Sequence, residues 1–152
     1  MLPLFPQELP TSCIAACVRM VLAHLGISLT EAEIRRRCGH TAAGMLLNEI
    51  ANGLRDLPVA VAYETGCGTD DLIDAIHGGL NPIVGIDLRP VDGIFAFHAV
   101  VVAGITARQV SVYDPQYPRG PRSIGLNTFE LAWYGADGEL VIIGPEPLIL
   151  AI

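Results

Sequence analysis

The apolar residues of this chain change their spacing halfway along it, and this change restricts the fold more than any other feature. Between residues 11 and 25 they recur at intervals of three and four, which predicts an amphipathic helix that ends at Gly26, with Thr11 or Ser12 as its cap. Three more helices are predicted from capping and breaker signals, over residues 30–39, 44–55 and 70–77, the last capped by Thr69.

The second half carries short apolar runs rich in β-branched residues, which predict strands. The predicted strands cover residues 82–88, 97–105, 109–114 and 140–143, with an earlier one over 59–63 and a short helix over 127–134. Helices first and an antiparallel sheet after them describe the α+β class. With 152 residues, the chain is expected to form a single domain, 1–152, whose proline-rich residues 1–10 form an extended arm.

Composition excludes several classes of function. Nine Lys and Arg against sixteen Asp and Glu leave a net charge of −7, so the chain has no electrostatic footprint for nucleic acid. The longest apolar stretches, such as residues 94–105, are too short to insert into a bilayer. Residues 1–6 contain two prolines and neither Lys nor Arg, unlike a secretory signal, and four cysteines are too few for a disulfide scaffold. We therefore expect a cytoplasmic protein with reduced thiols.

Cys13 occupies the first turn of the first predicted helix. The unpaired N–H groups and the positive end of the helix dipole there favour the thiolate over the thiol, provided that the sulfur is partly exposed. The plainer interpretation is a buried cysteine that packs as a small apolar residue, and we expect that role for Cys17, one turn later on the same face. A reactive thiolate at Cys13 would need a base, and the base would need an orienting acceptor.

His98 is the candidate base, because it opens the most hydrophobic predicted strand, whereas the other three histidines lie towards helix ends or in a loop. A hairpin between 97–105 and 109–114, with its turn around Thr106 and Ala107, pairs residues whose numbers sum to about 212 and places His98 opposite Asp114. A carboxylate at that position can fix the imidazole tautomer and stabilise the imidazolium. A hydrogen-bonded histidine of the core is the alternative interpretation.

An oxyanion formed at Cys13 would need hydrogen-bond donors. The backbone N–H of Cys13 is one, and Gln7 is the candidate for the second, because it carries the one side-chain amide among the first twelve residues. Gln7 lies six residues before Cys13 in a stiff, proline-rich segment, although the spacing alone favours a surface glutamine.

Together, Gln7, Cys13, His98 and Asp114 resemble the catalytic set of the papain-like cysteine peptidases. The segments QELPTSCIAAC (7–17), HAVVV (98–102) and YDP (113–115) are most similar to the C39 family, the leader-peptide peptidases best known as the N-terminal domain of bacteriocin-processing ABC transporters. The resemblance implies a papain-like fold of N-terminal helices packed on an antiparallel sheet. It also implies roles: Cys13 as nucleophile, His98 as general base and then acid, Asp114 as orienting carboxylate and Gln7 as oxyanion donor, with no cofactor and no metal.

The implied reaction is hydrolysis of a peptide bond after small residues, and the implied partner is a peptide or protein substrate, such as a small leader peptide. Two positions depart from the family pattern: Ser12 stands where an acidic residue is usual, and Ile14 where a glycine is usual. Neither supplies the nucleophile or the base, so we expect a change in the shape of the binding pocket. The membrane and ATPase domains of the transporters are not in the sequence, so a stand-alone peptidase is expected.

Three other interpretations fit the same residues. Cys13-x3-Cys17 and Cys38-x-His40 offer four zinc ligands, although neither pair has the usual spacing. A domain of the same fold could capture peptides without cleaving them. The same triad could also serve an amide-forming transferase or a deamidase, because these enzymes share the chemistry of the nucleophile.

Two further segments have no place in the catalytic set. Residues 119–122 hold two arginines in a predicted loop, where they could bind acidic groups of a substrate near Asp114. The apolar end of the chain, residues 145–152, could pack on the domain or bind a partner.

Overall fold

The computed structural model describes residues 2–146, which form helices and one antiparallel sheet, as predicted for the α+β class. The helices are α1 (Cys13–His24), α2 (Glu31–Arg37), the 3-10 turn η1 (Leu47–Glu49), α3 (Ile50–Gly53), α4 (Thr69–His77), α5 (Arg89–Asp92) and α6 (Leu126–Tyr134). The strands are β1 (Val59–Glu64), β2 (Ile83–Asp87), β3 (Phe97–Ile105), β4 (Gln109–Tyr113), β5 (Arg122–Gly125) and β6 (Leu140–Pro145). Among these residues, none of the helices has both the length and the apolar character needed to span a membrane. Most of the apolar end, residues 147–152, lies outside the described part of the chain.

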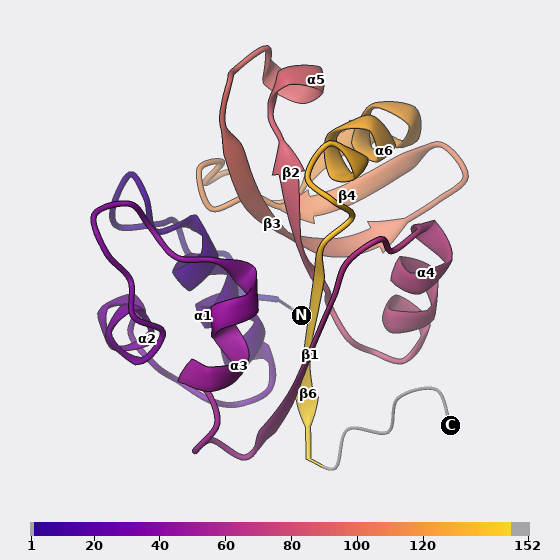
Figure 1. Cartoon of the computed structure of the whole chain (residues 1–152). Coiled ribbons are helices and arrows are strands. Elements are labelled where there is room, and N and C mark those ends of the chain that lie inside the picture. The colour runs from indigo at the N-terminus through magenta and orange to yellow at the C-terminus, as the bar shows by residue number, and fades with distance from the viewer. Residues whose placement is uncertain (1, 147–152) are drawn as a thin grey trace.

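The six strands form one sheet in the order β1-β6-β2-β3-β4-β5, and every neighbouring pair is antiparallel. Strands β2 to β5 follow one another in space as they do along the chain. β6 lies between β1 and β2, and Figure 1 shows it in yellow beside the purple β1. Residues 140–145 therefore join β1 to the rest of the sheet.

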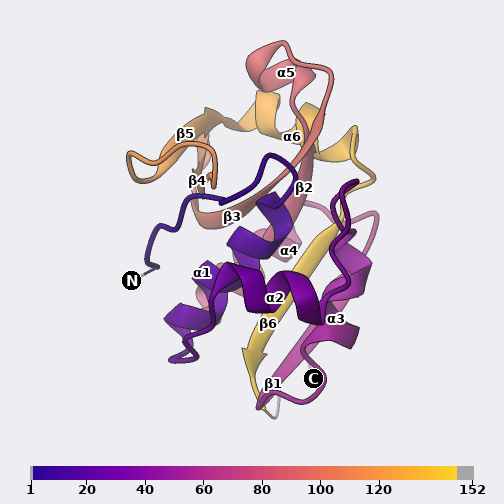
Figure 2. The same cartoon turned by 90° about the vertical axis from the view of Figure 1, so that its left-hand side faces the viewer.

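Helices cover both faces of this sheet. In Figure 1, α1, α2 and α3 lie on one side of it and α4 and α6 on the other, and Figure 2 is viewed from the side of α1 to α3. Side chains alternate along β3 between the two layers: Ala99 and Val101 pack in the core with α1, and Val100 and Val102 in the core with α6. Burial on both faces explains why residues 97–105 form a nearly continuous apolar run.

Most of the predicted elements are present, with ends that differ by a few residues, and two predictions need correction. The predicted helix over 44–55 is replaced by η1 and α3, because the preceding residues form a tight turn in which Thr41 pairs with Gly44, whose φ is +92°. Thr69 is the first residue of α4 and not its cap; Gly68 is the cap, and its N–H donates to the Asp71 carboxylate. The short elements α5 and β5, of four residues each, are additional to the prediction.

Candidate active site

Cys13 is the first residue of α1, and its side chain is half-buried. Ser12 occupies the cap position, but its hydroxyl makes no capping bond to the helix and instead accepts a hydrogen bond from the N–H of Leu9 (2.9 Å). The first N–H groups of a helix have no intrahelical acceptor, so their partial positive charge lies beside the sulfur. Cys13 therefore lies at the positive end of the α1 dipole.

His98 and Asp114 are both buried, and Nε2 of the imidazole lies 2.6 Å from Oδ1 of the carboxylate. Because a carboxylate only accepts hydrogen bonds, Nε2 carries a proton, and Nδ1 is the nitrogen available to Cys13. Burial lowers the pKa of His98, but the hydrogen-bonding and charge effects of Asp114 and Cys13 outweigh it and raise this pKa to about 9. The ring is therefore an imidazolium at neutral pH.

The hairpin that brings His98 to Asp114 has a different register from the predicted one. The numbers of paired residues sum to 215 near the turn, as for Ile105 and Val110. Beyond a β-bulge at residues 102–104 they sum to 214, whereas the predicted sum is 212. Without the bulge, the sum would stay at 215 along the whole hairpin, and the side chains of His98 and Asp114 would then point to opposite faces of the sheet. The bulge restores an even sum, so the two side chains meet diagonally and not directly across the ladder.

Three groups hold the carboxylate of Asp114. Oδ1 accepts from the N–H of Gln116 (2.8 Å) as well as from His98, and Oδ2 accepts from Nη1 of Arg122 (3.2 Å). Burial raises the pKa of Asp114, but these contacts, that of His98 first, outweigh it and lower the pKa below its ordinary value. Arg122 lies in β5 and not in a loop as predicted, and it binds a carboxylate of the protein itself.

Gln7 belongs to the N-terminal arm that precedes α1, and Figure 2 draws this arm in indigo. Its backbone N–H donates to the carbonyl of Pro115 (2.9 Å), the residue after Asp114. Its side-chain amide donates to the carbonyls of Leu9 (2.8 Å) and Pro10 (3.1 Å), and within residues 2–146 its buried Oε1 has no partner. The arm thus reaches the end of β4, with the Gln7 amide bound by its own loop.

A buried carboxylate that the sequence pattern does not single out fixes the rest of this arm. Glu31, the first residue of α2, is fully buried. Its Oε1 accepts from the N–H of Glu8 (2.8 Å) and lies 3.1 Å from the hydroxyl of Ser12, and its Oε2 accepts from Nε of Arg35 (2.9 Å). In the sequence, an acidic residue after Thr30 indicates only the start of a helix, and glutamates are seldom fully buried, so this role had no signal.

The other three cysteines are buried, and burial is the first cause that raises their pKa values. The pKa of Cys17 is well above its ordinary value, that of Cys38 is about 11, and that of Cys67 is also raised. Cys17 packs in the core, as predicted. No group of three or more His, Cys, Asp or Glu side chains in the described part of the chain is arranged to hold a metal ion, so Cys38 and His40 do not complete a zinc site with α1.

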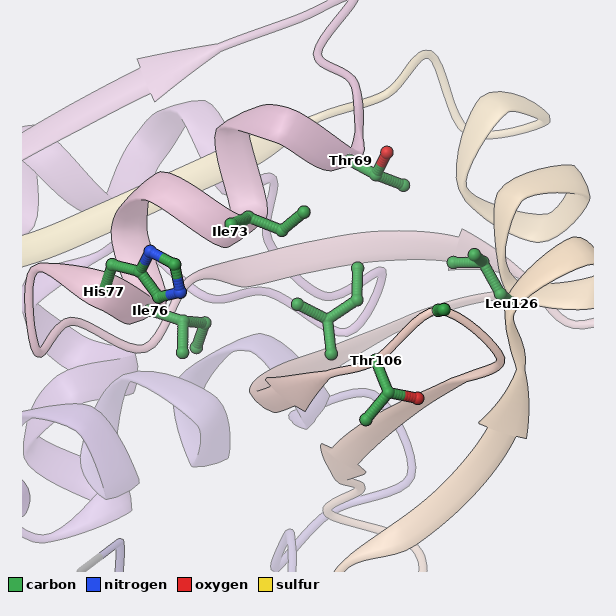
Figure 3. A pocket seen from close by; sticks show the side chains of 8 residues that line it. Thr69, Ile73, Ile76, His77, Thr106 and Leu126 are labelled. Carbon is green, nitrogen blue, oxygen red and sulfur yellow. The ribbon is translucent and has the colours of Figure 1, made fainter.

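A separate pocket of about 380 Å³ lies between α4, the β3–β4 turn and the start of α6. Figure 3 shows Ile73, Ile76 and Leu126 around it, together with His77 and Thr106. Its lining is mainly apolar and includes neither a thiol nor any of the four candidate residues. This pocket is therefore separate from the four candidate site residues.

A half-buried cysteine at a helix start and a buried, hydrogen-bonded pair of His98 and Asp114 are groups of the kind that nucleophilic acyl transfer uses. Comparison with known proteins agrees with this chemistry, since the model of the Peptidase_C39 like family matches residues 1–140. No curated protein matches the sequence significantly.

Solved structures with the same fold are peptidase domains. The peptidase domain of Streptococcus ComA, a bi-functional ABC transporter involved in a quorum sensing pathway, is 20% identical, with a TM-score of 0.78 over 96% of this chain and 100% of that one. A double glycine motif protease from an AMS/PCAT transporter, solved in complex with the leader peptide, is 19% identical, with a TM-score of 0.74 over 95% and 92% of the two chains. The peptidase domain of Streptococcus mutans ComA is 19% identical, with a TM-score of 0.66 over 93% and 98%. The papain-like fold predicted for the chain is therefore confirmed.

Proposed function

The chain belongs to the Peptidase_C39 like family, and on this premise we propose that it is a cysteine-type endopeptidase in which Cys13 is the nucleophile. The observation that carries the proposal is the contact between His98 and Asp114, formed where the charge of Cys13 also acts on the imidazole. In this proposal His98 is the general base and then the general acid, and Asp114 orients it. Gln7 and the backbone N–H of Cys13 stabilise the oxyanion.

The charges around Cys13 support its assignment as the nucleophile. Because the pKa of His98 is raised to about 9, its imidazolium can neutralise a thiolate at neutral pH. The other three cysteines are buried with raised pKa values, so they remain thiols. Of the four cysteines, Cys13 is the one that combines partial exposure with a cationic neighbour and the positive end of a helix.

The reaction is acyl transfer through a thioester. The Cys13 sulfur attacks the carbonyl carbon of the peptide bond, and the π electrons move to the oxygen, which accepts a hydrogen bond from the backbone N–H of Cys13. The His98 imidazolium gives its Nδ1 proton to the leaving nitrogen as the C–N bond breaks. Neutral His98 then takes a proton from water, the water oxygen attacks the thioester carbon, and the C–S bond breaks to restore the thiolate and the imidazolium.

Gln7 must exchange one hydrogen bond to act as the second oxyanion donor. Both protons of its amide are bound, one by the carbonyl of Leu9 and one by that of Pro10. A neutral hydrogen bond of this kind contributes about 0.5–1.5 kcal/mol net, and a bond to a charged acceptor is stronger, so the oxyanion can replace one of these carbonyls. Gln7 is then a donor chiefly in the transition state.

We propose peptides with small residues before the cleaved bond as the substrate class. The structurally similar AMS/PCAT protein is a double glycine motif protease and was solved with its leader peptide, which makes a double-glycine leader the first substrate to test. Ile14 follows the nucleophile in the sequence and packs against the core, at a position where the family usually has glycine. Its larger side chain should alter the preference for residues around the cleaved bond.

Cleavage profiling by mass spectrometry tests this function. The protein is incubated with a peptide library that contains Gly-Gly, Gly-Ala and Ala-Ala sites together with bulky ones, and cleavage after the small residues is expected. Cys13→Ala should abolish cleavage, because the carbonyl carbon then meets no nucleophile, whereas Cys67→Ala should cleave like the wild type. Cleavage by Cys13→Ala at the wild-type rate would refute the assignment.

Two further measurements separate the proposed peptidase from related functions. A peptide-binding domain without activity would bind library peptides and release no product, and its Cys13 would react with iodoacetamide no faster than Cys67. A transferase would give a product heavier by an added amine, and a deamidase would change the mass of a glutamine peptide without cleaving it.

A further inference from the structure

The second oxygen of the Asp114 carboxylate contacts a residue outside the proposed catalytic set. Oδ1 is shared between His98 and the N–H of Gln116, and Oδ2 accepts a hydrogen bond from Nη1 of Arg122 at 3.2 Å. The side chain of Asp114 is only 4% exposed, so leaving Oδ2 without a donor would be costly. Arg122 supplies that donor.

Arg122 is itself held from its other side. Asp92, the last residue of α5, forms an ion pair with the guanidinium through both of its carboxylate oxygens. The planar, forked guanidinium thus bridges Asp92 and Asp114, two carboxylates from distant parts of the chain. This anchoring fixes the position of the Arg122 donor relative to Asp114.

We propose that Arg122 is a positioning residue of the active site, whose guanidinium, anchored by Asp92, holds the Asp114 carboxylate in the orientation that fixes the His98 ring. Arg122 acts through Asp114 and is not a group that touches the reacting atoms. The expected effect on turnover rests on the proposed function, whereas the expected effect on the reactivity of Cys13 needs no substrate.

The surrounding charges set the direction of that effect. Besides each other, the titratable and charged groups that act on His98 and Asp114 are Cys13 and Cys17 on α1 and Arg122 on β5, and Asp92 on α5 acts on Arg122. The charge of Arg122 is among the causes that lower the pKa of Asp114. Removing this cation makes the site more negative, so the groups around it should hold their protons up to a higher pH.

The test compares Arg122→Gln, Arg122→Lys and Arg108→Gln in the full chain. Arg108 is exposed and lies in the turn between β3 and β4, so its replacement removes the same charge away from Asp114 and from residues 119–122. One readout is kcat and KM on a peptide that the wild type cleaves. The other is the rate of alkylation of Cys13 by iodoacetamide across the acid, neutral and alkaline range.

For Arg122→Gln we expect kcat to fall about tenfold or more with little change in KM, because Arg122 orients the base and does not bind substrate. The midpoint of the alkylation profile should move up by about half a pH unit or more. Arg122→Lys keeps the charge but loses the forked guanidinium. Its alkylation profile should therefore stay near that of the wild type, while its kcat should lie between those of the wild type and Arg122→Gln. Arg108→Gln should match the wild type in both readouts.

A wild-type kcat together with a wild-type alkylation profile in Arg122→Gln would overturn the proposal. So would a loss of activity that follows the melting temperature while the alkylation midpoint stays fixed, because that result describes a merely structural role. If Arg122→Gln does not fold, an unchanged kcat in Arg122→Lys would contradict the need for the fork. If the wild type cleaves no peptide, the proposed function fails, and the alkylation midpoints still decide the role of Arg122.

Discussion

His98 receives opposing electrostatic influences, and their balance decides its charge. Burial favours the neutral ring, whereas the hydrogen-bonding and charge effects of Asp114 and Cys13 favour the cation and prevail, raising the pKa to about 9. The same carboxylate occupies Nε2, so the nitrogen left for the chemistry is Nδ1. The Asp114 carboxylate thereby favours the charged form of the His98 ring and also decides which ring nitrogen is free to transfer a proton.

Replacing Gln7 shows whether its side chain is an oxyanion donor or only holds the N-terminal arm in place. If its amide donates to the oxyanion, Gln7→Ala should lower kcat by about 10²- to 10³-fold and leave KM nearly unchanged, because the lost bond forms only in the transition state. Steady-state kinetics on the best library peptide measure this effect. Gln109→Ala, which removes an exposed amide at the start of β4, is the control. A lower melting temperature with an unchanged kcat would assign Gln7 to the arm alone.

At the level of elements, the predictable parts of the fold are those with a clear apolar period. The spacing along α1 and the run of β-branched residues in β3 each predict their element to within two residues of its ends. The register of the β3–β4 hairpin is not predictable in the same way, because it depends on a one-residue bulge at residues 102–104. β5 is too short to carry a pattern, and for this reason the contact of Arg122 with Asp114 has no sequence signal.

The start of α2 holds the arm through Glu31, so neutralising this carboxylate should loosen the segment before Cys13. We expect Glu31→Gln to lower the free energy of unfolding by about 1–3 kcal/mol, because the bonds to the Glu8 N–H and to Arg35 weaken in a fully buried position. Urea denaturation measures this change, and kcat should fall with it. Glu33→Gln is the matched control, since its partners lie near the surface and the expected loss is below about 1 kcal/mol. Equal losses in the two variants would contradict the role of Glu31.

At the level of the whole molecule, the candidate site joins residues that are almost a hundred positions apart in the sequence. The sequence predicts the contact of His98 with Asp114, and the structure contains it, although by a diagonal approach. The orientation of the Gln7 amide is not predictable from the sequence, because it depends on which carbonyls the folded arm presents. The catalytic roles themselves stay predictions that the variants described above test.

The ion pair of His98 and Asp114 should make the stability of the whole fold depend on pH. The pKa of His98 rises from 6.5 to about 9 on folding, so its stabilisation is complete below about pH 6.5 and is lost as the pH rises through about 9. The pKa of Asp114 is lowered from 3.8, so its stabilisation is present above that value and is lost as the pH falls through the lower one. The stability of the wild type over Asp114→Asn should therefore be greatest between about pH 4 and pH 6.5.

Urea denaturation at a series of pH values measures this difference. Asp70→Asn, which replaces an exposed carboxylate on α4, should give a profile parallel to that of the wild type from neutral to alkaline pH. A stability difference between the wild type and Asp114→Asn that stays constant from acid to alkaline pH would show that the ion pair does not contribute.

β6 is synthesised after the other five strands, yet it occupies an inner position between β1 and β2. Until residues 140–145 have left the ribosome, β1 has no strand beside it, and the layers of helices have no complete sheet on which to pack. Until β6 is in place, the nascent chain therefore holds Cys13 in an incomplete fold. A chain that ends before β6 is expected to lack the complete sheet that brings α1 and the β3–β4 hairpin together.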